Sequence, residues 1–131
     1  RIAARPRQRV CLLRRWWLSP LCRIGGFGMR FANSIGGYEI DSLPSQVQVA
    51  ICHGFFVDPN MRGQGHGHKL KGLQECDLRE LAYDYALCTV SAKNVAQHRV
   101  LDAAGWQKLA QFNNRRLGES TQIWGKAVEA L

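Results

Sequence analysis

Acidic residues are absent from the first 38 positions of the sequence, although eight arginines lie there. From Glu39 onward, ten basic residues balance ten acidic ones, so the net charge of +8 comes entirely from the N-terminal part. Apolar runs of the roughly 18 residues that a membrane-spanning helix needs are also absent. These absences exclude a membrane-spanning helix and predict a basic leader, residues 1–28, followed by one domain, residues 29–131.

Closely paired cysteines are missing too, because the five cysteines are scattered and form no C-x-x-C pair. Zinc ribbons and thioredoxin-like redox sites use that spacing, so we predict neither, and we expect no metal cofactor. Scattered cysteines are typical of thiols in a reducing compartment, which predicts a cytoplasmic protein. His66 and His68 have no carboxylate or cysteine nearby at ligand spacing, so we interpret them as loop side chains rather than metal ligands.

The leader, residues 1–28, admits three interpretations. Trp16 and Trp17 stand beside two arginines and would suit a basic arm that binds nucleic acid or an anionic membrane surface. An arginine-rich, acid-poor segment also fits the remnant of a targeting signal. A charge run can equally be a solvated, poorly ordered extension outside the functional protein, which would then begin at Met29. Because the body is neutral, we do not expect nucleic acid to be its main partner.

The body has the pattern of a mixed α/β fold. The predicted elements, in order, are a strand at 47–57, a helix after the glycines of 63–67, a strand at 84–91, a helix at 94–104, and strands at 106–113 and 121–128. One face of the first helix carries Leu70, Leu73, Leu78 and Leu81, which assigns charged residues such as Lys71 and Asp77 to the solvent side. A hairpin is predicted around the Gly36-Gly37 pair.

Three alternating glycines, Gly63, Gly65 and Gly67, stand between the predicted strand and the first helix. Glycines let the backbone turn its N–H groups toward a ligand, and a helix start adds unpaired donors and a positive dipole end. The segment therefore predicts a phosphate-binding loop. It is not a Walker A loop, because Gly63 and Gly67 are one residue too close and Leu70 replaces the required hydroxyl. The spacing of the third glycine also excludes a dinucleotide fingerprint.

The pattern Arg62-x-x-Gly65-x-Gly67, set between a strand ending in Val-Asp-Pro and an amphipathic helix, resembles the pyrophosphate-binding motif of the GNAT (GCN5-related) N-acetyltransferases. The segment from Asn94 to Gly105-Trp106 is similar to the downstream helix pattern of that family. Together the two blocks cover residues 47–128. The resemblance implies the GNAT acyl-CoA N-acyltransferase fold, with a mixed central sheet and a splayed strand pair.

The resemblance also implies a cofactor, acetyl-CoA, which serves as the co-substrate. The residues implied to bind it are Phe55, Phe56, Val57, Arg62, Gly63, Gln64, Gly65, His66, Gly67, His68 and Asn94. Asn94 can also cap its helix, and the two roles are compatible. The implied reaction is direct attack of a primary amine of a small molecule or peptide on the thioester. That attack needs a base for the amine, donors for the carbonyl oxygen and a proton for the thiolate.

Two positions depart from the pattern of the family. Many relatives have a tyrosine acid seven residues after the helix asparagine, where this chain has Leu101, and some have a glutamate base where it has Thr89. His53 is the candidate base that remains, because an imidazole can accept a proton near neutral pH, although it can also be a hydrogen-bonded strand histidine. Residues 29–46 show no helix pair, so the N-terminal half is abbreviated or is completed by another subunit, as in a homodimer.

These departures leave three functions in view. The first is an acetyl-CoA-dependent N-acetyltransferase, which we predict. The second is a non-catalytic acyl-CoA-binding or interaction module on the same fold, which Leu101, Thr89 and the short N-terminal half would suit. The third is nucleic-acid binding through the arginine-rich leader.

Overall fold

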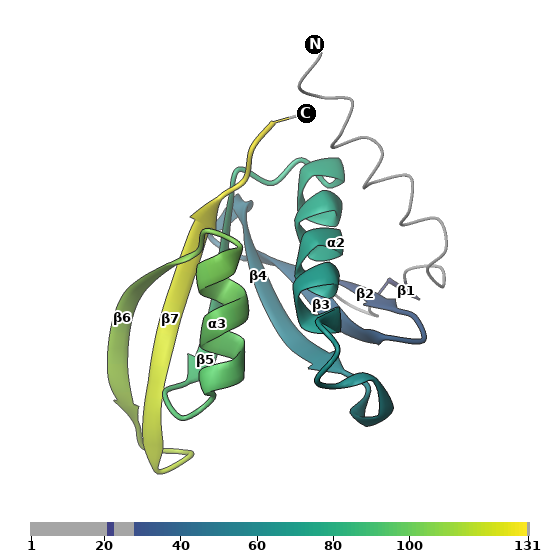
Figure 1. Ribbon diagram of the computed structural model, residues 1–131. Helices are drawn as coiled ribbons and strands as arrows, with labels where there is room; N and C mark the ends of the chain where they lie inside the picture. Colours follow the sequence, from purple (N-terminus) through teal and green to yellow (C-terminus); the bar gives the residue numbers. More distant parts are fainter. Residues whose placement is uncertain (1–20, 23–27, 131) are drawn as a thin grey trace.

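The computed structural model describes residues 21–22 and 28–130, with side chains described from residue 28 onward. The elements, labelled as in Figure 1, are β1 (Leu21–Cys22), β2 (Met29–Ala32), β3 (Gly36–Leu43), β4 (Gln46–Val57), the 3-10 turn η2 (Pro59–Met61), α2 (His66–Glu80), β5 (Tyr85–Ser91), α3 (Val95–Ala103), β6 (Gln107–Asn114) and β7 (Glu119–Ala127). From β4 onward, the predicted order of strand, helix, strand, helix and hairpin is confirmed. The other leader residues, and the three interpretations of the leader, lie outside the described residues.

One seven-stranded sheet, in the order β1-β2-β3-β4-β5-β7-β6, forms the centre of the fold. Neighbouring strands are antiparallel except β4 and β5, which run parallel, so the sheet is mixed as predicted. Figure 1 shows α2 and α3 side by side on the same face of this sheet. No described residue before β4 is helical, which agrees with the absence of a helix pair from the sequence pattern of residues 29–46. None of the described helices has the length and apolarity to cross a membrane.

The parallel pair β4 and β5 separates partway along its length. Its paired positions run from Val49 opposite Tyr85 to Cys52 opposite Cys88, and β4 then continues to Val57 without pairing with β5. Gly54 has a left-handed φ of 64°, and the β3–β4 register is irregular beside it. A bulge of this kind bends the strand and re-aims its end. The two strands therefore diverge toward their carboxyl ends (Figure 1), which confirms the predicted splayed pair.

Helix α2 packs on the sheet through more residues than the leucine stripe predicted. Leu70, Leu73 and Leu78 are buried as expected, whereas Leu81 lies just past the helix end and is exposed. Lys71 and Asp77 were predicted to face solvent, and that prediction is wrong, because each is only 1% exposed. The hydroxyl of Tyr38 donates to a carboxylate oxygen of Asp77 at 2.5 Å, which compensates part of the cost of burying that carboxylate.

The hairpin predicted around Gly36-Gly37 exists, but its turn lies earlier. Asn33 makes the turn, because its side-chain oxygen accepts from the backbone N–H groups of Ile35 and Gly36 at 2.8 and 3.2 Å. Gly36 and Gly37 lie inside β3, where their close packing explains the glycines. A Cβ on Gly36 would overlap the carbonyl oxygen of Phe56, and one on Gly37 would lie 2.5 Å from the carbonyl oxygen of Phe31.

The cysteines agree only in part with the predicted thiols. Cys52 and Cys88 are free, buried neighbours on β4 and β5. Cys76, on α2, is disulfide-bonded, which the scattered spacing did not predict.

Candidate functional site

Two adjoining cavities lie where β4 and β5 diverge. The outer cleft, about 540 Å³ in volume, is bounded by the end of β4, the glycine loop and the start of α3. The inner cavity, about 250 Å³, lies between β4 and β5 and is bounded beneath by α2. Phe55, Asn94 and Gln97 line both, so the two spaces adjoin at these residues. The divergence of the strands thus leaves one space beside the glycine loop and a second between β4 and β5.

Most of the predicted cofactor residues meet at the outer cleft. The residues that line it are Phe55, Phe56, Val57, Arg62, Gly63, Gly65, His66, Gly67, His68 and Asn94. Gln64, also predicted, is exposed and does not line the cleft. Ten of the eleven residues that the resemblance implied therefore line this cleft, and five further lining residues were not predicted: Met61, Ala96, Gln97, Arg99 and Val100.

The glycine loop has the backbone geometry of an anion site. Gly63 and Gly65 both have φ of 77°, a conformation that side chains rarely adopt, and Gly65 is the N-cap of α2. No side chain caps α2, so the N–H groups of its first turn are left for a ligand at the positive end of the helix dipole. The glycine at position 67 has a different explanation, because a Cβ there would lie 3.3 Å from the Val100 side chain on α3.

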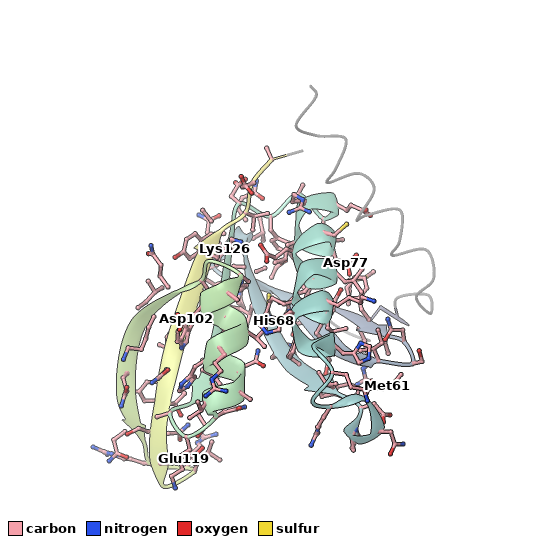
Figure 2. All side chains as sticks on the ribbon, viewed as in Figure 1. Met61, His68, Asp77, Asp102, Glu119 and Lys126 are labelled. Carbon is pink, nitrogen blue, oxygen red and sulfur yellow. The ribbon has the colours of Figure 1, made fainter. Side chains whose placement is uncertain are left out.

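The outer cleft is positively charged. Arg62 and Arg99 both line it, and no described carboxylate does. The Nε of Arg62 donates to the carbonyl oxygen of Val57 at 3.0 Å, which holds the guanidinium at the mouth of the cleft. Figure 2 shows His68 on the side of α2 that faces α3, whereas Met61 lies on the turn before the loop. Two guanidinium groups beside an uncapped helix start favour a multiply charged anion.

Asn94 stands at the junction of the two cavities. Its side-chain oxygen accepts from the N–H of Gln97 at 3.2 Å, so the predicted N-cap of α3 is confirmed. Asn94 also lines both spaces, so the capping residue of α3 lies where the two cavities adjoin.

The inner cavity contains the candidate base. His53 lines it, and its Nε2 lies 2.5 Å from a carboxylate oxygen of Asp41 on β3. A carboxylate at this distance orients the imidazole. Thr89 lines the same cavity from β5. Leu101 lines neither cavity and is fully buried in the core. The position at which many relatives have a tyrosine therefore provides no proton donor for the thiolate.

Lys71 and Gln74 also line the inner cavity, and sequence reasoning missed both. Lys71 Nζ donates to Gln74 Oε1 at 2.7 Å and lies 4.6 Å from the ring centroids of Phe55 and Trp106. Burial lowers the pKa of the Lys71 ammonium. The missed signal is the spacing of Lys71, Gln74 and Leu78, which at i, i+3 and i+7 share one helix face.

Two thiols complete the wall of the inner cavity. Burial raises the pKa of Cys52 to about 12 and also raises the pKa of Cys88. Both groups are therefore neutral thiols near pH 7 and are poor nucleophiles.

The comparisons with known proteins identify the fold. No protein-family model matches the chain, and no curated protein does. Among solved structures, the ribosomal-protein-S18-alanine N-acetyltransferase of Escherichia coli matches with a TM-score of 0.64 at 14% identity, over 83% of this chain and 73% of that one. Spermidine N-acetyltransferase of Vibrio cholerae, solved with CoA and spermine, matches with a TM-score of 0.66 at 16% identity, over 77% of this chain and 66% of that one. A Bacillus subtilis acetyltransferase in complex with CoA matches with a TM-score of 0.64 at 11% identity, over 79% of this chain and 78% of that one. The chain has the GNAT acyl-CoA N-acyltransferase fold.

Proposed function

We propose that this protein is an N-acetyltransferase that moves an acetyl group from acetyl-CoA to a primary amine. The observation that carries the proposal is the pair of adjoining cavities, which we interpret as one path from an uncapped, glycine-framed helix start into the gap between β4 and β5. A charged diphosphate at one end and a neutral thioester at the other would match the polarity of that path.

The cofactor would lie along the path in the order of its own parts. Its diphosphate would accept from the backbone N–H groups of residues 63–68, with Arg62 adding positive charge. The pantetheine arm would follow residues 55–57, the part of β4 that has no pairing with β5. Gln64 would contribute through its backbone alone, because its side chain does not line the cleft.

The reaction would take place in the inner cavity. The amine nitrogen forms a bond to the thioester carbon, the C–S bond breaks, and CoA leaves as the thiol after taking up a proton. His53, oriented by Asp41, would accept the proton of the amine. Backbone N–H groups of the splayed strand would stabilise the developing oxyanion. With Leu101 buried, the thiolate would receive its proton from water or from another group in the cavity.

The acceptor proposed is a small-molecule or peptide amine in the cytoplasm. Two of the proteins with this fold act, by name, on spermidine and on the alanine of ribosomal protein S18. We propose that a second copy of the chain completes the acceptor wall, because residues 28–45 contribute no helix before β4.

The direct test combines binding with turnover. The full chain should bind acetyl-CoA in calorimetry, and it should release CoA thiol when spermidine, an alanyl peptide or a lysyl peptide is added. Failure to bind acetyl-CoA would refute the proposal. Binding without amine-dependent release from any acceptor would favour the second candidate, a non-catalytic acyl-CoA-binding module, for which the buried Leu101 is the supporting observation.

The role of His53 has its own test. His53→Gln should lower kcat by about 10²–10⁴-fold, the usual contribution of a general base, with the affinity for acetyl-CoA unchanged. His98→Gln is the matched control, because His98 lies outside both cavities and contacts Trp124 and the Ser91 carbonyl oxygen. Equal losses in the two variants would show that His53 acts on stability rather than on proton transfer.

A further inference from the structure

Arg99 is a cation of the outer cleft to which the proposed binding of acetyl-CoA gives no role. It lines the cleft from α3, and the residue is exposed. No ion pair or hydrogen bond joins its side chain to another described residue. Asp102, the one acid of α3, lines a separate hollow formed with β6 and β7. Because an arginine stays charged near neutral pH, the guanidinium of Arg99 is available to an anionic ligand.

The two arginines of the outer cleft reach it from different elements. Arg62 precedes the glycine loop, and its hydrogen bond to the Val57 carbonyl oxygen holds it beside the end of β4. Arg99 is the chain neighbour of Val100, whose side chain lies against Gly67 in the first turn of α2. Arg62 therefore borders the glycine loop from β4, whereas Arg99 borders it from α3. Two separate anionic groups of one ligand would each find a guanidinium there.

Coenzyme A carries phosphate at two places, a diphosphate in the middle of the molecule and a phosphate monoester on the 3′-oxygen of the ribose. With the diphosphate on the glycine loop and the pantetheine arm along residues 55–57, the ribose would lie on the outer side of the loop. The monoester has a charge of about −1.5 to −2 at pH 7. Among the described residues that line the cleft, Arg99 is the only arginine or lysine besides Arg62. Its planar guanidinium can donate two parallel hydrogen bonds to such a phosphate.

We propose that Arg99 binds the ribose 3′-phosphate and makes the protein select thioesters of CoA over those of dephospho-CoA. This inference rests on the proposed function, because it assumes that the diphosphate of acetyl-CoA occupies the glycine loop. The transfer step is unchanged, since the 3′-phosphate is at the opposite end of the cofactor from the thioester and serves only for recognition.

The test compares two cofactors that differ only in this phosphate. Calorimetry on the full chain should give about tenfold tighter binding of acetyl-CoA than of acetyl-dephospho-CoA, as expected for a charge-assisted contact. Arg99→Met should remove that difference by weakening the binding of acetyl-CoA alone. Arg99→Lys retains the charge without the paired donors, so it should retain part of the difference. Because Arg99 is exposed and methionine is a good helix former, Arg99→Met should unfold at nearly the wild-type temperature.

Two other cations near the glycine loop provide the controls. Arg62→Met should weaken the binding of both cofactors equally, because Arg62 is assigned to the diphosphate, which both contain. Lys69→Met removes an exposed charge from the first turn of α2 without changing the lining of the cleft, so it should leave the preference intact.

Each outcome decides the inference. Equal affinity of the wild type for the two cofactors would overturn it, since the 3′-phosphate would then lie in solvent. A preference that survives Arg99→Met, or that Arg62→Met or Lys69→Met removes, would also overturn it, because another cation would then bind this phosphate. Binding of acetyl-CoA without any preference refutes this inference alone, whereas failure of both cofactors to bind refutes the proposed function as well.

Discussion

Gly65→Glu is expected to weaken acetyl-CoA binding by about a hundredfold or more, which corresponds to roughly 3 kcal/mol. Gly65 is the N-cap of α2 with φ of 77°, and no other group lies within 4 Å of the position that a Cβ would occupy. A glutamate would therefore fit without overlap, but it would bring a carboxylate to the anion site and strain the backbone. Calorimetric titration with acetyl-CoA measures the loss.

A second glycine provides the control for this substitution. Gly118, in the turn between β6 and β7, has φ of 68° and equally open surroundings, but it lies outside both cavities. Gly118→Glu introduces the same charge and a similar backbone strain, so it should lower stability by a similar amount and leave acetyl-CoA affinity unchanged. If both variants lose affinity equally, or if Gly65→Glu binds normally, the glycine loop is not the diphosphate site.

Gly36→Ala is expected to destabilise the fold by about 3 kcal/mol, at the upper end of the usual overpacking cost. The added methyl would overlap the Phe56 carbonyl oxygen and lie 2.9 Å from Val57 Cα, and both neighbours are backbone of β4. Backbone atoms cannot turn aside as a flexible side chain can, so β3 and β4 must separate at their Gly36–Val57 pair. Urea denaturation measures the free energy of unfolding, and the midpoint of thermal unfolding should fall by more than roughly 10 °C.

Gly72→Ala adds the same methyl group but is expected to stabilise the fold. Gly72 lies within α2, and nothing lies within 4 Å of the position of its Cβ. Alanine there should raise stability by roughly 0.5–1 kcal/mol, because glycine loses more conformational freedom in a helix interior. A Gly36→Ala variant as stable as Gly72→Ala would show that β3 and β4 do not pack as closely as described.

Local signals predicted much of the fold. The strand pattern before the loop, the alternating glycines and the Asn94 cap each depend on residues close together in the chain. The resemblance carried by Arg62, the glycines and Asn94 then implied the splayed pair, and the structure has one between β4 and β5.

Other features depended on contacts between distant segments. The Gly36-Gly37 pair was interpreted as a turn, because glycine is permissive in turns, and nothing in the sequence says that the backbone of Phe56 lies against it. Lys71 and Asp77 were assigned to the surface, because helical periodicity orders residues around an axis but does not say how far the covering sheet extends.

By itself, the sequence determined the elements from β4 onward and the mixed α/β class, because short-range spacing sets strands, caps and glycine turns. The family resemblance of the sequence implied most of the residues that line the outer cleft. Only the tertiary structure decided that the inner cavity exists and that Lys71 and Gln74 border it. Burial there results from where β4 leaves β5 and from how α2 crosses beneath them, and both depend on packing between segments far apart in the chain.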